Sequence, residues 1–499
     1  MPKEMGPGAN QMKENSTNLK SRAIHGLFWS ALEKFGQLAV QVVITIVIAR
    51  VLLPSDYGLV GMLSVFLAFA STFVESGFGT ALIQDRDATD IEFSTVFYSN
   101  AAFGVLLYLL MYAAAPSIAV FYDQPVLVPL SRVMSLILIT NSLGLIHSTI
   151  LMKGIKFKIL AKISLMSVVI SGLAGIIMAY NGFGVWSLVF QSLINSITRS
   201  CLLWTLNRWK PAISFSVDAF KRLYAFGSKL LFSGLLFQIF DNIYAVIIGK
   251  TYDSSQLGLY AQAKNMSSIP IGTVTSIIQT VSFPILSTIQ NEDQRLRDNY
   301  RRVIKLVVCV TFPLSLLLIV VAKPLTIVLL TEKWLPVVPL FQLMCLAGLF
   351  FPLTTINLNI LNVKGRPDIF LVLEIIKKAT IVVVLVFTAR KGVMAIIMGQ
   401  VLCNFIGSTL DLIYAGRIID YPLKAQISDI LPYFLAALAM AIVGFLVPPL
   451  LVQSYSLLLG VQVIFSILAF IVVCIMFKLD SFFELLAISK NILQTAKFV

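Results

Sequence analysis

Charged and amide side chains recur at helical spacing inside stretches of this sequence that are otherwise apolar. Between residues 26 and 49 they are Glu33, Gln37 and Gln41, each four residues apart. Residues four apart lie on one face of an α-helix, so these three form a single polar stripe. Lys34 lies beside its first member. Groups of this kind either bond to one another between helices or face a hydrated cavity that takes a polar or charged ligand. The sequence offers no nucleophile elbow, metal-ligand cluster or glycine-rich phosphate loop, so it does not indicate catalysis.

A charge at the centre of a membrane-spanning helix costs roughly 2.5–3.5 kcal/mol, so it must face water or a partner. We therefore predict a hydrated cavity lined by ten residues from five apolar stretches: Lys34, Arg132, Lys264, Lys229, Glu33, Gln37, Gln41, Glu75, Gln238 and Asp241. The cations would suit phosphate groups, and the carboxylates leave an organic cation open as the ligand. Serines on the same faces are expected to bond between helices. Glu374 and Lys378 are expected to pair with each other across one turn.

The composition places these stripes in a membrane. The chain has 499 residues, of which 58% are hydrophobic and 12% charged, against roughly 45–50% and 25% in soluble domains. A spanning helix needs roughly 20 apolar residues. The sequence predicts an all-α polytopic membrane protein with about fourteen such helices, at 26–49, 58–78, 92–115, 127–150, 159–179, 183–205, 225–249, 257–288, 303–322, 335–362, 368–389, 392–416, 427–448 and 456–477.

The basic residues are distributed unevenly along this topology. With both termini assigned to the cytoplasm, 25 of the 38 lysines and arginines lie in cytoplasmic segments and 6 in outer loops. This asymmetry is the positive-inside signature of a membrane protein. The net charge of +14 is therefore explained by topology, and no nucleic-acid partner is expected.

An internal repeat organises the helices. Residues 46–59 read IVIARVLLPSDYGL and residues 246–259 read VIIGKTYDSSQLGL, which aligns Gln41 with Asp241 at an offset of 200. Each copy holds six spans, an even number, so the copies are parallel repeats that form two lobes. The predicted organisation is a disordered cytoplasmic leader at 1–21, six-helix lobes at 22–210 and 211–418, helices 13 and 14 at 419–477, and an interfacial amphipathic tail at 478–499.

One segment carries a resemblance to a known family. Residues 49–84, with Pro54, the Asp56-Tyr57-Gly58 step and the run from Glu75 to Gly79, resemble the first hairpin of bacterial polysaccharide transporters. These are the Wzx-type flippases of the multidrug/oligosaccharidyl-lipid/polysaccharide exporter superfamily, and the segment looks closest to their WzxC-like branch. The likeness extends over the whole chain in span number and repeat layout.

The resemblance implies a flippase of the bacterial inner membrane that works by alternating access. It implies that undecaprenyl-pyrophosphate-linked repeat units of O-antigen, capsule or exopolysaccharide move from the cytoplasmic to the outer leaflet. It also implies coupling to an ion gradient, with H⁺ and Na⁺ both open. The expected partners are the lipid-linked oligosaccharide, membrane lipids and glycan assembly enzymes. No cofactor, metal or enzymatic activity is expected. A multidrug or cation antiporter and a lipid II flippase of the same superfamily remain alternatives.

The charge asymmetry makes a testable prediction about topology. Alkaline phosphatase, which is active only outside the cytoplasm, should be active when inserted within 323–334 and inactive when fused after Val499, because basic loops stay inside. Enzyme activity normalised to fusion abundance is the measurement. A C-terminal fusion as active as the loop insertion would contradict the assignment of both termini to the cytoplasm.

Overall fold

The computed structural model describes residues 36–75, 77–85 and 88–496. Within these ranges the chain forms helices and no strand, which confirms the predicted all-α fold. The first helix described is Gly36–Val51. The next eight are α2 Pro54–Glu75, α3 Phe78–Gln84, α4 Asp90–Tyr122, α5 Leu127–Met134, α6 Leu136–Lys153, α7 Phe157–Tyr180, α8 Val185–Asn207 and α9 Val217–Thr251.

The second half of the chain continues in the same way. Its helices are α10 Ser254–Thr288, α11 Asp293–Leu330, the 3₁₀ turn η1 Glu332–Trp334, α12 Val337–Gly348, α13 Phe351–Val363, α14 Pro367–Thr388, α15 Val393–Ile418, α16 Leu423–Leu446, α17 Pro448–Leu451, α18 Tyr455–Met476 and α19 Asp480–Ala496.

The described residues contain ten helices that are long and apolar enough to cross a membrane, so the protein is a multi-pass membrane protein. Every one of the fourteen predicted spans is helical in its described part. Four of them fall outside the ten: the short helix Gly36–Val51, and α8, α10 and α14. The total of fourteen membrane spans therefore stays a prediction.

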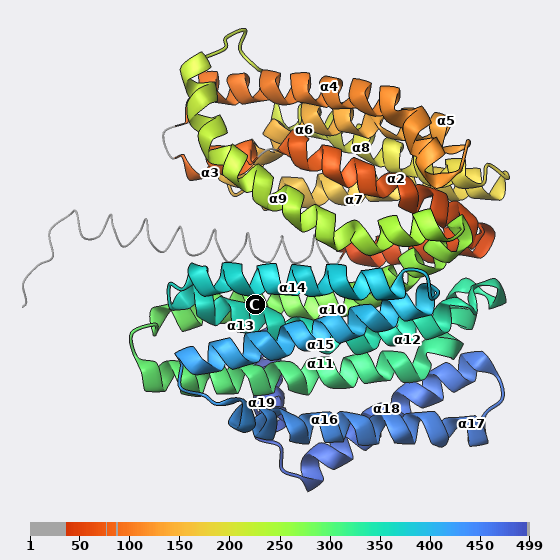
Figure 1. Ribbon diagram of the computed structural model, residues 1–499, viewed down its shortest axis with the longest axis vertical. Coiled ribbons are helices and arrows are strands. Elements are labelled where there is room, and N and C mark those ends of the chain that lie inside the picture. Colours follow the sequence, from red (N-terminus) through yellow and green to blue (C-terminus); the bar gives the residue numbers. More distant parts are fainter. Residues whose placement is uncertain (1–35, 76, 86–87, 497–499) are drawn as a thin grey trace, which may run out of the picture. The chain divides into compact units, whose positions relative to one another are not determined.

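The described residues up to Leu257 form one compact unit, and those from Gly258 onward form a second. In the first unit α4, α6 and α8 pack side by side, α7 packs on α8, and α9 packs along α2, α3 and α4 (Figure 1). The predicted boundary between lobes at residue 210 is a repeat boundary and stays a prediction. The compact unit runs past it because α9 packs on the helices that precede it.

The segment that carries the family resemblance has clear local roles. The Asp56 carboxylate accepts a hydrogen bond of 3.0 Å from the Leu53 backbone amide at the start of α2. Gly58 lies where a Cβ would overlap the carbonyl of Ser254, so any side chain there would push the two backbones apart. Gly77 separates α2 from α3 with a φ of 68°, a left-handed conformation that glycine adopts without strain.

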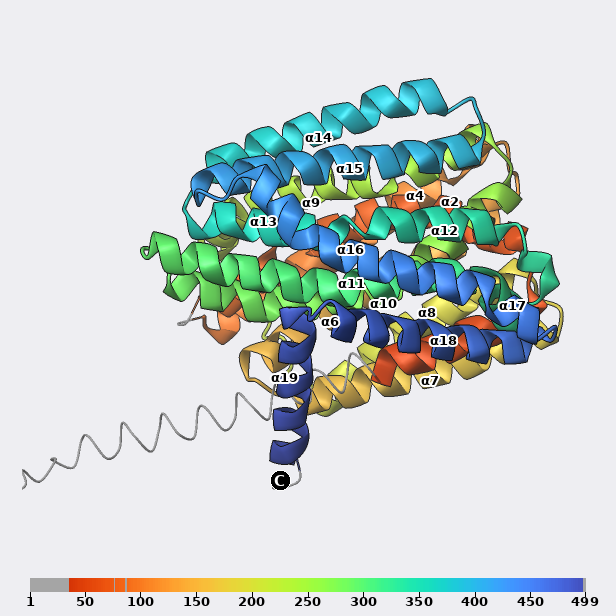
Figure 2. The ribbon, with the colours of Figure 1, turned by 90° about the horizontal axis from the view of Figure 1, so that it is seen from below.

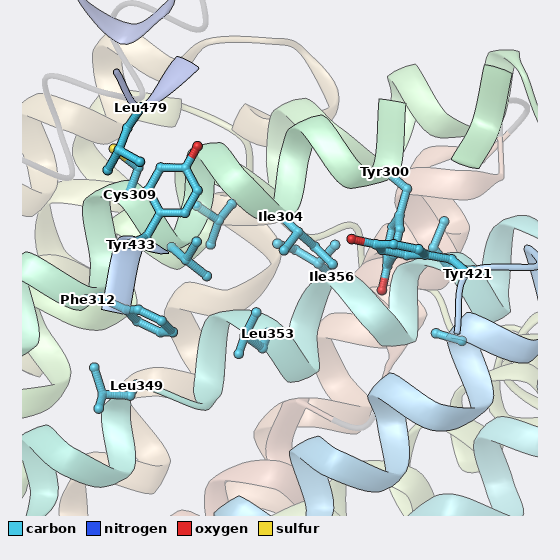
Figure 3. Close-up of a cluster of buried hydrophobic side chains, with 14 of the residues drawn as sticks. Tyr300, Ile304, Cys309, Phe312, Leu349, Leu353, Ile356, Tyr421, Tyr433 and Leu479 are labelled. Atoms are coloured by element: carbon cyan, nitrogen blue, oxygen red, sulfur yellow. The ribbon is translucent and has the colours of Figure 1, made fainter. Parts of the chain in front are cut away.

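The core of the second unit is built around α11. Tyr300, Ile304 and Phe312 of α11 pack against Leu353 and Ile356 of α13 (Figure 3). The fully buried Tyr300 hydroxyl donates a hydrogen bond to the Asn357 side-chain carbonyl. Tyrosine is buried at little cost when its hydroxyl has such a partner. α11 is the longest described helix at 38 residues, and α16 and α18 pack along it.

The last helix runs in a different direction from its neighbours. Figure 2 shows α19 lying across the direction of α16 and α18. Arg302 of α11 forms an ion pair of 2.5 Å with Glu484 of α19, and Tyr433 of α16 donates to Ser481 at 2.9 Å. Phe483 remains exposed. A crosswise amphipathic helix with an exposed apolar face fits the predicted interfacial tail.

The close packing of α16 on α18 can be tested through one glycine. A Cβ at Gly444 would overlap the Ser466 side chain, so Gly444→Val is expected to destabilise the protein by about 1–3 kcal/mol, the usual cost of overpacking. Thermal unfolding of the purified protein in detergent is the measurement. Gly460→Ala on α18 is the control, because a Cβ there meets open space. Equal unfolding temperatures for the two variants would contradict this packing.

Candidate functional site

A pocket of about 490 Å³, lined by both polar and apolar residues, lies in the first unit. The end of α2, the turn at Gly77, α3, α6 and α8 supply its walls. Its volume falls in the range of roughly 300–1,000 Å³ that is usual for ligand sites. Half of its eighteen lining residues can form hydrogen bonds or carry charge through their side chains: Ser71, Glu75, Thr80, Asn141, Ser148, Thr149, Ser196, Arg199 and Ser200.

Hydrogen bonds between α6 and α8 fix the back wall of this pocket. Ser196 donates to the Asn141 side-chain carbonyl at 2.6 Å, and Ser200 donates to the Thr140 backbone carbonyl at 2.5 Å. The Trp204 indole nitrogen donates to the Leu143 carbonyl at 3.0 Å. Polar bonds of this kind hold membrane helices together. They also fix the spacing of the side chains that face the pocket.

A second set of bonds anchors the chain where α3 ends, next to the pocket-lining Ile83 and Met152. The Lys153 ammonium donates to the Asp85 backbone carbonyl at 2.6 Å. Arg222 of α9 pairs with the Asp85 carboxylate at 3.3 Å and also with Glu92. Glu92 in turn accepts from the Thr89 amide at 2.7 Å and so closes a capping box at the start of α4. This end of the pocket is the one that the charge pattern assigns to the cytoplasm.

The charged residues that line the pocket are Glu75 and Arg199. Both side chains are exposed in the structure, so neither is buried as part of the packed core. A guanidinium presents five donors that match phosphate oxygens in a forked arrangement. The pocket therefore combines one cation for an anionic group with many hydroxyl and amide groups that match a sugar.

The structure places the ten predicted cavity residues in several locations. Glu75 is the one that lines this pocket. Glu33 and Lys34 lie outside the described residues. Gln37 and Gln41 lie on the helix Gly36–Val51, where Gln41 is exposed and Gln37 half-buried.

The remaining predicted residues lie on α5, α9 and α10. Arg132 of α5 stacks over the Tyr112 ring, with its guanidinium carbon 4.3 Å from the ring centroid. On α9, Lys229 and Asp241 are exposed, and Gln238 accepts a bond of 3.1 Å from Asn242. Lys264 is half-buried on α10, in the second unit. That these side chains meet the cargo stays a prediction.

The sequence reasoning missed Arg199 together with the polar side chains around it. The sequence does contain a pattern that indicates a polar helix face here: Ser196 and Ser200 are four residues apart, and Arg199 lies between them within a predicted span. Asn141 and Ser148 on α6 are likewise seven residues apart. Either spacing marks one face of a helix. What the sequence could not supply was that these two faces meet α2 and α3 around one cavity.

The expected pair of Glu374 and Lys378 is confirmed, with 3.7 Å between the ammonium and the carboxylate. The structure adds two members to it. Lys377 lies 2.5 Å from the other oxygen of Glu374 and 3.3 Å from Asp411 of α15. The pair is therefore part of a four-residue charge cluster within α14 and α15.

The fold and the pocket define a class of protein: a multi-pass helical membrane protein with an internal polar site. The solved structure of the lipid II flippase MurJ in an inward closed conformation has the same fold, with a TM-score of 0.73 and 17% identity, covering 90% of this chain and 99% of MurJ.

Sequence comparison places the chain within a family. The profile of the polysaccharide biosynthesis protein family matches residues 47–339, and the chain belongs to this family. The teichuronic acid biosynthesis protein TuaB of Bacillus subtilis is 28% identical over 70% of this chain and 73% of its own length. The lipopolysaccharide biosynthesis protein WzxC of Escherichia coli is 23% identical over 79% of this chain and 80% of its own length.

Water access to the pocket can be measured by cysteine labelling. In a background without the five native cysteines, Ser148→Cys should react with a water-soluble maleimide because residue 148 lines the pocket. Ser142→Cys, on the same helix, should stay unlabelled because that position is fully buried. Labelling extent by mass shift is the measurement. Equal labelling of the two cysteines would show that the pocket does not hold water.

Proposed function

We propose that the protein is a flippase for lipid-linked oligosaccharides. It would move undecaprenyl-pyrophosphate-linked repeat units of an O-antigen, capsule or exopolysaccharide from the cytoplasmic to the outer leaflet. One observation carries the proposal: a chain of the polysaccharide biosynthesis protein family has, over 90% of its length, the fold of a lipid II flippase. Both relatives compared above are named for the biosynthesis of a glycan polymer.

The physical task explains why such a protein needs a polar interior. Moving one unpaired hydroxyl into hydrocarbon costs about 4–8 kcal/mol, and an oligosaccharide carries many. The pocket of the first unit supplies hydroxyl and amide partners together with Arg199. The lipid tail is itself apolar, so it can remain in the bilayer while the headgroup passes through the protein.

The cations of the chain have distinct proposed roles. Arg199 is proposed to meet the pyrophosphate within the pocket. Lys34, Arg132 and Lys264, with Lys229 as a further cation, remain proposed phosphate contacts on the basis of the polar stripes. Of the polar residues, Glu33, Gln37, Gln41, Glu75, Gln238 and Asp241 are proposed to line the path of the sugar.

The setting of the protein is part of the same proposal. It would lie in the bacterial inner membrane with both termini in the cytoplasm, and it would alternate between inward and outward access. An H⁺ or Na⁺ gradient would drive it, and enzymes of glycan assembly would deliver and remove its cargo. Transport, and not catalysis, accounts for a polar pocket within apolar helices.

A lipid II flippase is the second candidate, and the likeness to MurJ favours it. Lipid II is also a pyrophosphate-linked saccharide, so the same pocket chemistry would serve. The two candidates differ in what the cell loses without the protein: a surface polysaccharide in one case and peptidoglycan synthesis in the other.

Deletion of the gene in its host tests the proposal. We expect loss of surface polysaccharide, accumulation of the lipid-linked intermediate in the cytoplasmic leaflet, and rescue by a plasmid copy. An Arg199→Ala copy should restore at least about tenfold less polysaccharide, because loss of a charged hydrogen bond costs about 1.5–3 kcal/mol. Arg366→Ala, an exposed arginine between α13 and α14, is the matched control and should rescue fully.

Other outcomes point elsewhere. Rescue of peptidoglycan synthesis in cells depleted of their lipid II flippase, with surface polysaccharide unchanged by the deletion, would establish the second candidate. Altered sensitivity to cationic drugs with both glycans intact would indicate the multidrug or cation antiporter. Full rescue by Arg199→Ala would remove the proposed role of the pocket arginine.

A further inference from the structure

Four charged side chains gather between α14 and α15 in the second unit. The Lys377 ammonium lies 2.5 Å from a Glu374 oxygen and 3.3 Å from an Asp411 oxygen. Lys378 lies 3.7 Å from the other Glu374 oxygen. Two ammonium groups therefore balance two carboxylates. Charges inside spanning helices are costly and mark ion or proton pathways more often than packing.

Asp411 is the member with the least usual environment. It is fully buried, and while one oxygen meets Lys377, its Oδ1 atom has no hydrogen-bond partner. Two further polar atoms also have none: the Ser408 hydroxyl, one turn earlier on α15 itself, and the Asn357 amide nitrogen on α13. Buried polar groups are nearly always paired, so the unpaired Oδ1 atom of Asp411 is an acceptor that a proton can occupy.

The helices packed on α15 define what surrounds Asp411. α13 places the Thr354 hydroxyl near Asp411, and α11 supplies the buried Tyr300 phenol, which interacts with it electrostatically. The titratable group of α12 is the buried Cys345. On α16 the carboxylate Asp429 is paired with Arg301 and Lys305 of α11. Among the described residues, Lys377 and Glu374 of α14 are the charged groups that act on Asp411, and Lys378 pairs with Glu374. The helix that carries Asp411, α15, adds Tyr414 and Cys403 as titratable groups.

The position of Lys377 decides which ligand fits. Its ammonium already occupies the space between the two carboxylates, where a metal ion would have to lie. Gly407 of α15 leaves room for its chain, since a Cβ there would approach the Lys377 side chain to 3.0 Å. In the part of the chain that the structure describes, no three His, Cys, Asp or Glu side chains are placed to hold a metal. A proton needs no coordination shell and can bind the unpaired Oδ1.

We propose that Asp411 is a proton-binding site, with Lys377 as its tethered counter-ion, through which a proton gradient drives the flippase; this inference rests on the proposed function. A hydronium ion on one side gives up its proton and leaves as water, and an O–H bond forms on Asp411. Lys377 keeps its protons and retains Glu374 as its partner. In the reverse step the O–H bond breaks, the proton passes to water on the other side, and Lys377 again pairs with Asp411.

The packing of α14 explains how one proton would produce movement. Of its 22 residues, Leu373 and Leu385 are the buried ones, and the helix packs along α15 and α13. The contacts of Lys377 with Asp411 join it to α15. Protonation neutralises Asp411 and leaves Glu374 to serve two ammonium groups. The proton thus weakens the bond between α14 and α15 and adds a positive charge that responds to the membrane potential.

A pH jump applied to proteoliposomes on a solid-supported membrane tests the site without any cargo. The wild-type protein should give a transient current as protons bind, and Asp411→Asn should lose it. Asp368→Asn is the matched control, because this carboxylate lies on α14 but is exposed and pairs with Arg366. Its current should equal that of the wild type. In the same liposomes, a pH gradient should accelerate the flipping of a lipid-linked oligosaccharide by the wild-type protein. It should not accelerate flipping by Asp411→Asn.

Loss of a buried partner can unfold a protein, so a second variant keeps the test decisive. Lys377→Met/Asp411→Asn removes one charge of each sign and should fold, as judged by gel filtration, and still give no current. Wild-type current in either Asp411 variant, or flipping driven by a Na⁺ gradient and indifferent to pH, would overturn the proton site. A current that depends on Asp411 in liposomes that do not flip the oligosaccharide would preserve the proton site and overturn the proposed function.

Discussion

The cost of an unpaired polar group in hydrocarbon governs this structure. Within a bilayer the backbone must satisfy its own hydrogen bonds, which leaves helices as the available elements here, and every described span is one. The same cost applies to side chains. Ser196 of α8 donates a hydrogen bond to Asn141 of α6, and Lys377 forms ion pairs with two carboxylates. Asp411 keeps one oxygen without such a partner, and a proton can complete it.

This constraint explains which features the sequence could predict. Helices follow from runs of apolar residues, so all fourteen predicted segments are helical where described. The pair of Glu374 and Lys378 was also predictable, because four residues of one helix fix its geometry. Lys377 and Asp411 are 34 positions apart, and their meeting depends on how α14 packs on α15. Spacing along one helix carries no information about that packing, and the same holds for Arg199 at the wall made by α2, α3 and α6.

The two units divide the work that the proposed function requires. The first holds a pocket of hydroxyl and amide groups with one arginine, which suits a sugar phosphate. The second holds a neutral cluster of four charges beside unpaired polar atoms, which suits the uptake of a proton. The Lys377 ammonium is already engaged by Glu374 and Asp411, so it is not available as a cation for the cargo's phosphates.

The length of α11 has a mechanical consequence. Its 38 residues span about 57 Å at 1.5 Å per residue, nearly twice the roughly 30 Å of hydrocarbon. A rod of that length cannot end within the bilayer at both ends, so its basic first turns must stand in the layer of lipid headgroups. There Arg302 holds α19 through Glu484. The Arg302–Glu484 ion pair therefore anchors α19 to the part of α11 that extends beyond the hydrocarbon, so the tail is held at the membrane surface by a helix whose remainder lies within the bilayer.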